Sequence, residues 1–164
     1  MLNLHTGVKT ICSDCDLVVE AAIENMEIKK QTFKELGAIC KADCVFATNT
    51  SSLSITEIGA GLDRPVIGMH FFNPAPVMKL VEVIAGLNTP VEIVDKVKKI
   101  SEEIGKIPVQ VEEGAGFVVN RILIPMINEA MNCIRNSQKM PSTILYLMII
   151  VHTMNRVKTN RWNW

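Results

Sequence analysis

Residues 66–84, VIGMHFFNPAPVMKLVEVI, contain two apolar runs separated by a proline-rich loop. The runs at 66–70 and 79–84 are rich in valine, isoleucine and leucine, which is typical of buried β-strands. The prolines at positions 74 and 76 exclude a helix between the runs and hold the residues before them in extended backbone. We therefore expect two neighbouring strands, with a rigid loop at the carboxyl end of the first, where open α/β sheets bind their ligands.

One histidine and one glutamate interrupt these apolar runs. His70 ends the first run, and Glu82 lies inside the second. A buried carboxylate is costly unless it is paired or hydrogen-bonded, so a contact with His70 across adjacent strands would account for both residues. The carboxylate would fix the tautomer of the imidazole and raise its basicity, as a general base requires. The alternative is a structural histidine with Glu82 facing water, and the spacing alone leaves both interpretations open.

The rest of the chain alternates strands with helices, which is typical of a doubly wound, mostly parallel sheet. Apolar β-branched runs predict further strands, and periodic apolar residues predict helices. The expected strands are 17–22, 44–48 and 109–111, and the expected helices are 24–39, 55–58, 90–104 and an apolar one from 117, which Pro125 is expected to kink.

Two of these helices carry specific expectations. In the helix at 24–39 we expect one apolar face toward the sheet and the charged residues, Lys29 among them, toward water. The helix at 90–104 is expected to start with Thr89 as N-cap, Pro90 as first helical residue and Glu92 completing a capping box. Its apolar stripe is expected to consist of Ile93, Val97, Ile100 and Ile104, and Gly105 is expected to end it.

Composition narrows the class of protein. The chain has 164 residues, 48% of them hydrophobic, which is enough for one globular domain with a core. The apolar run at 144–151 is too short to cross a bilayer, and the first ten residues lack the apolar core of a signal peptide, so we expect a cytoplasmic location and no membrane partner. The net charge is zero, but five basic residues and no acidic ones follow Glu129. This basic tail shows no cluster of base-reading residues, so we expect no nucleic-acid partner.

Cysteine spacing raises the possibility of a metal site. Cys12 and Cys15, with Cys40 and Cys44, would supply the four thiolates that zinc prefers. No glycine-rich knuckle accompanies either pair, so we favour free thiols in a reducing compartment and expect no metal.

Four segments together resemble the NAD-dependent 3-hydroxyacyl-CoA dehydrogenases. They are 14–25 (DCDLVVEAAIEN), 47–53 (ATNTSSL), 68–84 and 116–129 (GFVVNRILIPMINE), and the resemblance is nearly continuous from about residue 14 to 130. It is strongest to bacterial members that act on short acyl chains, so the resemblance implies a short-chain substrate. The resemblance implies oxidation of (S)-3-hydroxyacyl-CoA by NAD⁺ to 3-oxoacyl-CoA and NADH, in fatty acid and butanoate metabolism, by a homo-oligomer.

The resemblance also implies roles for individual residues. His70 matches the base that takes the proton of the substrate hydroxyl, and Glu82 matches its carboxylate partner. Ser51 matches a residue that contacts the substrate oxygen beside the nicotinamide. Asn73 and Asn120 match asparagines that help to hold histidine and substrate. The positions matched to cofactor binding are Glu24, Lys29, Ser51 and Asn73.

The sequence departs from the family pattern at both ends. No G-x-G-x-x-G turn is present among the 164 residues, so we expect weakened NAD binding. We accordingly expect a truncated and impaired dehydrogenase, with the latter half of a Rossmann-like, mostly parallel sheet followed by the first helix of an all-α domain. The expected organisation is a divergent segment at 1–13, a partial NAD-binding domain at 14–112, the start of the helical domain at 113–134 and a divergent basic tail at 135–164. The alternative is a non-catalytic remnant that acts as an association module.

Overall fold

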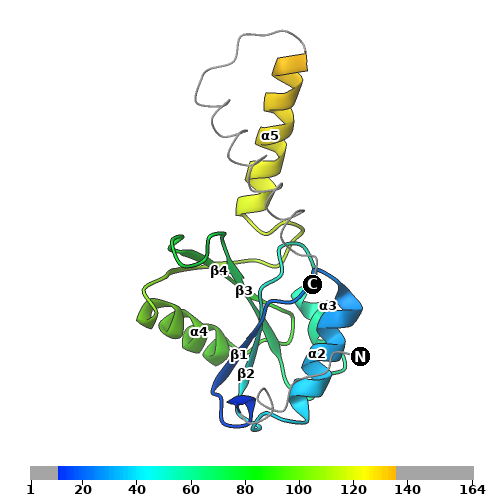
Figure 1. Ribbon diagram of the computed structural model, residues 1–164, viewed down its shortest axis with the longest axis vertical. Helices are drawn as coiled ribbons and strands as arrows, with labels where there is room; N and C mark the ends of the chain where they lie inside the picture. Colours follow the sequence, from blue (N-terminus) through cyan, green and yellow to red (C-terminus); the bar gives the residue numbers. More distant parts are fainter. Residues whose placement is uncertain (1–10, 136–164) are drawn as a thin grey trace. The chain divides into compact units, whose positions relative to one another are not determined.

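The computed structural model describes residues 11–135, which divide into two units after Phe117. The segments 1–10 and 136–164, with the expected divergent start and most of the basic tail, lie outside the described residues. The described elements are β1 (Leu17–Glu20), α2 (Met26–Gly37), β2 (Val45–Thr48), α3 (Ile55–Gly59), β3 (Val66–Phe71), β4 (Leu80–Ala85), α4 (Val91–Glu103), β5 (Ile107–Val111) and α5 (Val119–Arg135) (Figure 1).

The five strands form one sheet in the order β1-β2-β3-β4-β5. Three neighbouring pairs are parallel, and only β3 and β4 run antiparallel. A parallel pair requires a crossover connection, and helices provide it where the strands are parallel. The prediction of a Rossmann-like, mostly parallel sheet is therefore confirmed.

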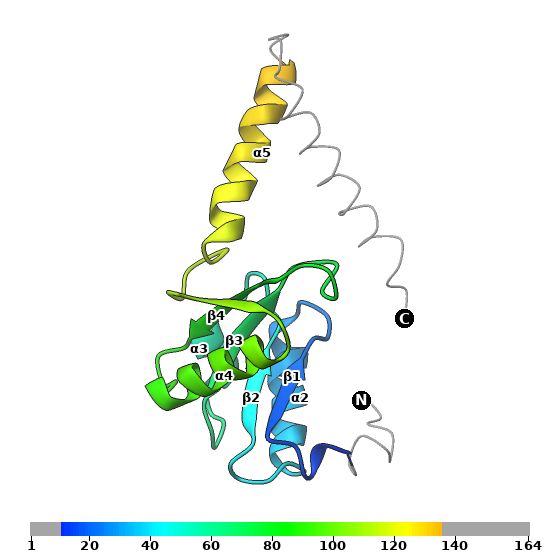
Figure 2. The same cartoon turned by 90° about the vertical axis from the view of Figure 1, so that its left-hand side faces the viewer.

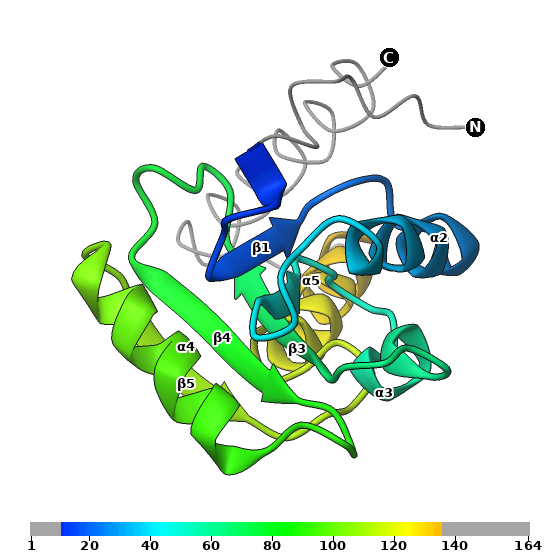
Figure 3. The ribbon, with the colours of Figure 1, turned by 90° about the horizontal axis from the view of Figure 1, so that it is seen from below.

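Helices cover both faces of this sheet. Figure 3 shows α2 and α3 on one face and α4 on the other, and in Figure 2 α4 lies in front of the strands. The α2 face buries Phe33 against Phe46, with ring centroids 5.2 Å apart, and the α4 face buries Val94 and Val97 against the strands. Each fully buried side chain of this size contributes about 1.5–3 kcal/mol, so the two cores hold the sheet rigid beneath its carboxyl edge.

Asn25 is the N-cap of helix α2, and its Oδ1 accepts a hydrogen bond from the Ile28 amide. The expectation that Lys29 faces water is wrong, because the structure buries its side chain completely. Lys29 follows Met26 by three residues and precedes Phe33 by four, so it lies on the same helical face as these apolar residues. The positive charge of Lys29 had favoured the face of the helix that points to water.

Helix α4 begins one residue later than predicted. Pro90 is its N-cap and no side-chain cap bond is present, because Thr89 Oγ1 donates instead to the Val66 carbonyl at the start of β3. The predicted capping box is therefore wrong. Ile104, expected on the apolar stripe, is 54% exposed, and the buried face consists of Val94, Val97 and Ser101. The predicted stop at Gly105 is confirmed by its left-handed φ of 77°.

The second unit is described only through α5, a helix of 17 residues that contains Pro125. None of the helices in the described part of the chain is both long and apolar enough to cross a membrane.

Candidate functional site

The histidine and glutamate that interrupt the two apolar strands face each other. Antiparallel pairing places His70 opposite Glu82, and Nδ1 of the imidazole lies 2.8 Å from Oε2 of the carboxylate. His70 is 4% exposed and Glu82 1% exposed. A carboxylate buried this deeply is stable only with a partner, and the imidazole supplies one. The contact orients the ring so that Nε2 is the nitrogen left for chemistry.

Two phenylalanines pack against the imidazole. The ring centroids of Phe72 and Phe117 lie 4.7 and 5.5 Å from that of His70. Phe117 has a φ of 49°, in the left-handed region that non-glycine residues rarely adopt, directly after Gly116 with a φ of 75°. This strained turn places an aromatic ring beside the histidine, so the site holds the imidazole by packing as well as by hydrogen bonding.

The loop after β2 brings a hydroxyl to the other ring nitrogen. Ser51 Oγ lies 3.2 Å from His70 Nε2. Asn49, two residues earlier, accepts from the Phe71 amide at the end of β3, which ties this loop to the strand that carries the histidine. A hydroxyl, an imidazole and a carboxylate thus lie in one hydrogen-bonded line, an arrangement able to move a proton to or from a bound alcohol or ketone.

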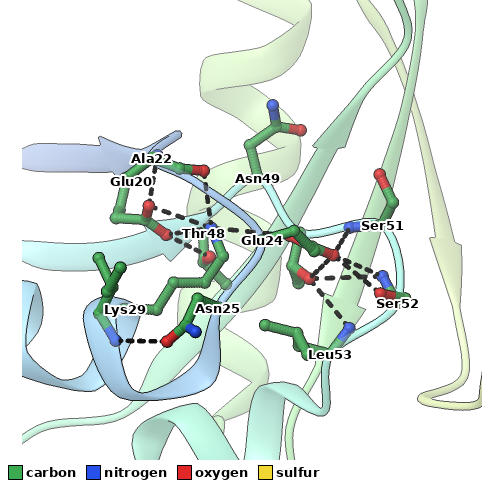
Figure 4. Close-up of polar contacts among 12 residues, drawn as sticks. Glu20, Ala22, Glu24, Asn25, Lys29, Thr48, Asn49, Ser51, Ser52 and Leu53 are labelled. Carbon is green, nitrogen blue, oxygen red and sulfur yellow. Dashed lines mark hydrogen bonds and ion pairs between the residues drawn. The ribbon is translucent and has the colours of Figure 1, made fainter. Parts of the chain in front are cut away.

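Glu24 accepts several hydrogen bonds from the same loop. Its Oε1 accepts from the Thr50 hydroxyl at 2.6 Å, from the amides of Ser51 and Ser52 at 2.8 and 2.9 Å, and from the Ser52 hydroxyl at 3.0 Å (Figure 4). Burial raises the pKa of the Glu24 carboxyl, but these hydrogen bonds and the nearby Lys29 charge outweigh burial and hold the pKa below its usual value. The carboxylate is therefore ionised at neutral pH.

A buried ion pair lies next to Glu24. Lys29 Nζ contacts the two carboxylate oxygens of Glu20 at 3.0 and 2.8 Å and the Ala22 carbonyl at 3.4 Å. Thr48 donates its hydroxyl to Glu20 at 2.8 Å (Figure 4). The lysine joins helix α2 to the ends of β1 and β2. The Lys29 ammonium faces the protein interior, where these oxygens occupy its donors. Its predicted place near a cofactor stays a prediction.

Two candidates remain, one in each unit. Asn73 is exposed in the loop after β3. Asn120 is the second residue of α5, in the unit that begins at Val118. Their predicted roles toward substrate stay predictions.

The cysteines give the zinc interpretation no support. Cys40 and Cys44 are buried in the core under α2, and Cys12 and Cys15 pack against that core. Burial, with the neighbouring Cys44, raises the pKa of the Cys40 thiol to about 11, so it is protonated at neutral pH. Among residues 11–135, no three histidine, cysteine or acidic side chains are arranged to hold a metal ion.

Comparison with known proteins assigns a family to this geometry. The sequence model described as "3-hydroxyacyl-CoA dehydrogenase, NAD binding domain" matches residues 1–114, more than half of the chain. The chain belongs to this dehydrogenase family. The matched range contains every candidate residue except Asn120, and it includes the segment 1–13 that we set apart as divergent.

Two bacterial relatives show the extent of the similarity. The 3-hydroxybutyryl-CoA dehydrogenase of Clostridioides difficile is 61% identical over 119 residues, which is 71% of this chain and 42% of that protein. A probable 3-hydroxybutyryl-CoA dehydrogenase of Bacillus subtilis is 52% identical over 131 residues, 79% of this chain and 46% of that protein. The chain thus spans less than half the length of these curated relatives.

Solved structures agree. The crystal structure of 3-hydroxybutyryl-CoA dehydrogenase from Escherichia coli has a TM-score of 0.74 at 44% identity, covering 79% of this chain and 28% of that one. That of (S)-3-hydroxybutyryl-CoA dehydrogenase from Ralstonia eutropha has a TM-score of 0.73 at 45% identity, covering 78% and 46%. The fold of this chain is therefore similar to part of these two crystal structures.

Four supporting residues escaped the sequence analysis. Glu20 could have been found from the sequence, because a glutamate at the end of an apolar strand needs a buried partner. For the other three, Thr48, Phe117 and Glu113, the sequence offers no comparable pattern, because their contacts join segments far apart in the chain.

Glu113 fastens the loop after β5 to helix α3. Its carboxylate accepts from Ser54 Oγ at 2.6 Å, from the Thr56 amide at 3.0 Å and from the Thr56 hydroxyl. Burial raises the pKa of this carboxyl, but the hydrogen bonds from Ser54 and Thr56 prevail and lower it below its usual value. The loop that leads to Phe117 is thereby held in place.

Glu113→Gln is expected to lower the free energy of unfolding at neutral pH by about 1–2 kcal/mol. A carboxyl whose pKa is lowered by folding stabilises the protein above its unfolded-state pKa of about 4.3, and this contribution disappears as pH falls through the lower folded-state pKa. The difference between the variant and the parent chain should therefore shrink in acid. Urea unfolding at about pH 7 and about pH 3 measures it. Glu112→Gln, at the exposed neighbouring position, is the control, and a difference that stays constant with pH would contradict the assignment.

Proposed function

We propose that this dehydrogenase chain carries the proton-transfer half of an NAD-dependent 3-hydroxyacyl-CoA dehydrogenase. The reaction is (S)-3-hydroxyacyl-CoA with NAD⁺ to 3-oxoacyl-CoA with NADH. The observation that carries the proposal is the line from Ser51 through His70 to Glu82, with contacts of 3.2 and 2.8 Å, in a chain that belongs to this family. The relatives' names support a short acyl chain such as 3-hydroxybutyryl.

The residues divide the chemistry as follows. His70 Nε2 takes the proton of the substrate hydroxyl during oxidation and returns it during reduction. Glu82 stabilises the imidazolium that forms, and its burial strengthens that interaction. Ser51 donates to the substrate oxygen as it changes from hydroxyl to ketone, and we propose that Asn73 and Asn120 help to hold the substrate.

The described residues suit the nicotinamide end of NAD. NAD supplies the acceptor for the hydride that leaves the substrate carbon. We propose that Ser51 and Asn73 lie beside it, and that Glu24 and Lys29 lie near the cofactor and hold that side of its site in place. The pyrophosphate of a dinucleotide is usually held at a glycine-rich turn, and the 164 residues contain no G-x-G-x-x-G. A protein made of these residues alone is expected to bind NAD weakly.

We propose the wider setting by the same reasoning. Residues 14–112 form part of the NAD-binding domain, 113–134 begin a helical domain and 135–164 form a basic tail. The enzyme acts on acyl-CoA in fatty acid and butanoate metabolism in the cytoplasm, as a homo-oligomer without nucleic-acid or membrane partners.

Oxidation of NADH by acetoacetyl-CoA tests the proposal. The 164-residue chain is expected to turn over slowly or not at all, because it lacks the pyrophosphate turn. A hybrid in which residues 14–130 replace the aligned part of the Clostridioides difficile relative should restore the reaction. If the 164-residue chain alone oxidises NADH as fast as the intact relative, the expectation of weak NAD binding is contradicted. An inactive but folded hybrid, together with a chain that associates without binding NAD in calorimetry, would favour the association module.

A further inference from the structure

The loop that carries Ser51 is held by a carboxylate outside the line of proton transfer. Glu24 Oε1 accepts four hydrogen bonds from three consecutive residues, at distances of 2.6–3.0 Å. Two of the donors are the backbone amides of Ser51 and Ser52, so the contact fixes the path of the chain itself. In Figure 4 the Glu24 side chain points into the turn formed by Ser51, Ser52 and Leu53.

The Glu24 carboxylate is itself held near a buried ion pair. Lys29 Nζ lies 3.8 Å from Glu24 Oε2, and the same ammonium is paired with buried Glu20. Asn25, the residue after Glu24, caps helix α2 through its side chain. Position 24 is therefore held by a helix start on one side and a buried charge on the other, which leaves the carboxylate little freedom.

The Ser51 contact with His70 depends on this arrangement. Ser51 lies in a loop, and its hydroxyl reaches His70 Nε2 at 3.2 Å, near the outer limit of a good hydrogen bond. A small shift of the turn would break the contact. Within residues 11–135, the side chains of Thr50 and Ser52 make hydrogen bonds only to the Glu24 carboxylate and to backbone amides of the turn itself.

We propose that Glu24 is a positioning residue, whose carboxylate shapes the turn at 50–52 and so aims the Ser51 hydroxyl at His70. The proposal rests on the proposed function, which gives the Ser51 hydroxyl its role toward the substrate oxygen. It assigns Glu24 a role toward protein groups, through an acceptor oxygen that already takes four hydrogen bonds.

Nitrogen NMR of the histidine-labelled 164-residue chain tests the proposal without requiring turnover. The chain has three histidines, and the resonances lost in His70→Ala identify those of His70. Ser51→Ala removes the hydroxyl and should displace the Nε2 resonance. Glu24→Ala should displace it in the same direction. In the double variant Glu24→Ala with Ser51→Ala, we expect no displacement beyond that of Ser51→Ala alone.

Amide hydrogen exchange supplies a second measurement. Loss of the Glu24 acceptor is expected to speed exchange at the Ser51 and Ser52 amides by roughly five- to tenfold. Glu24→Gln keeps one acceptor oxygen and should fall between Ala and the parent chain. Glu27→Ala removes an exposed carboxylate from the first turn of α2 and is the matched control, which should leave both measurements unchanged.

The outcomes distinguish a failure of the positioning role of Glu24 from a failure of the proposed function. Displacements of Glu24→Ala and Ser51→Ala that add in the double variant, or an Nε2 resonance unmoved by Glu24→Ala in a folded chain, would overturn the proposal. If Glu24→Ala does not fold, the Glu24→Gln variant decides through the same double-variant comparison. An inactive hybrid with linked displacements would instead refute the proposed function and leave the coupling of Glu24 to Ser51 intact.

Discussion

Lys29→Met is expected to lower the free energy of unfolding by about 3–5 kcal/mol. The methionine fills most of the volume of the lysine but removes the only ammonium within 3.0 Å of Glu20 in the described part of the chain. Glu20 is 4% exposed, so its carboxylate would remain buried with the Thr48 hydroxyl and the Ala22 amide as partners. Because domains are stable by only about 5–15 kcal/mol, this loss is a large part of the total.

Chemical denaturation of the 164-residue chain measures this effect. Lys34→Met, at an exposed position on the same helix, is the control and should change stability by less than about 0.5 kcal/mol. The double variant Glu20→Gln with Lys29→Met removes both charges and should recover part of the loss, since no unpaired charge stays buried. A loss of less than about 1 kcal/mol in Lys29→Met would show that water reaches Glu20.

The sheet could be predicted because its elements are encoded locally. Apolar runs bounded by proline and glycine marked the strands, and the alternation with helices implied parallel pairing. Where two local indications disagreed, the prediction failed. Lys29 has the periodicity of a core position and the charge of a surface one, and only the distant Glu20 decides between them. Thr89 has the sequence of an N-cap, but the Val66 carbonyl in a neighbouring strand takes its hydroxyl.

In the candidate site, too, some residues could be predicted from the sequence pattern and others could not. The pairing of His70 with Glu82 was one of two interpretations that the apolar strands left open, since a buried carboxylate needs a partner but Glu82 could also have faced water. Ser51 came only from the family resemblance, since a serine in a hydroxyl-rich loop has no pattern that points to a histidine 19 residues away. Glu24 was expected beside the cofactor on the same resemblance, and its four hydrogen bonds to the turn depend on loop geometry that the sequence does not encode locally.

In the hybrid with the Clostridioides difficile relative, His70→Ala is expected to reduce the rate of NADH oxidation by about 10²- to 10⁴-fold, the usual contribution of a general acid or base. Glu82→Gln is expected to reduce it by roughly 10²-fold. The amide can keep a hydrogen bond to Nδ1, but it lacks the charge that stabilises the imidazolium. Since the pair is buried and 2.8 Å apart, that charge is screened little by solvent.

Steady-state rates with acetoacetyl-CoA measure both variants, and Glu102→Gln at an exposed site on α4 serves as the control. If Glu82 acts only through His70, the double variant His70→Ala with Glu82→Gln should be no slower than His70→Ala alone. Independent effects that multiply would mean that Glu82 also holds the strand pair in shape, and Glu82→Gln would then lose stability in the urea titration to match. A Glu82→Gln hybrid with full activity would remove the carboxylate from the mechanism and leave His70 with Ser51 as the reacting pair.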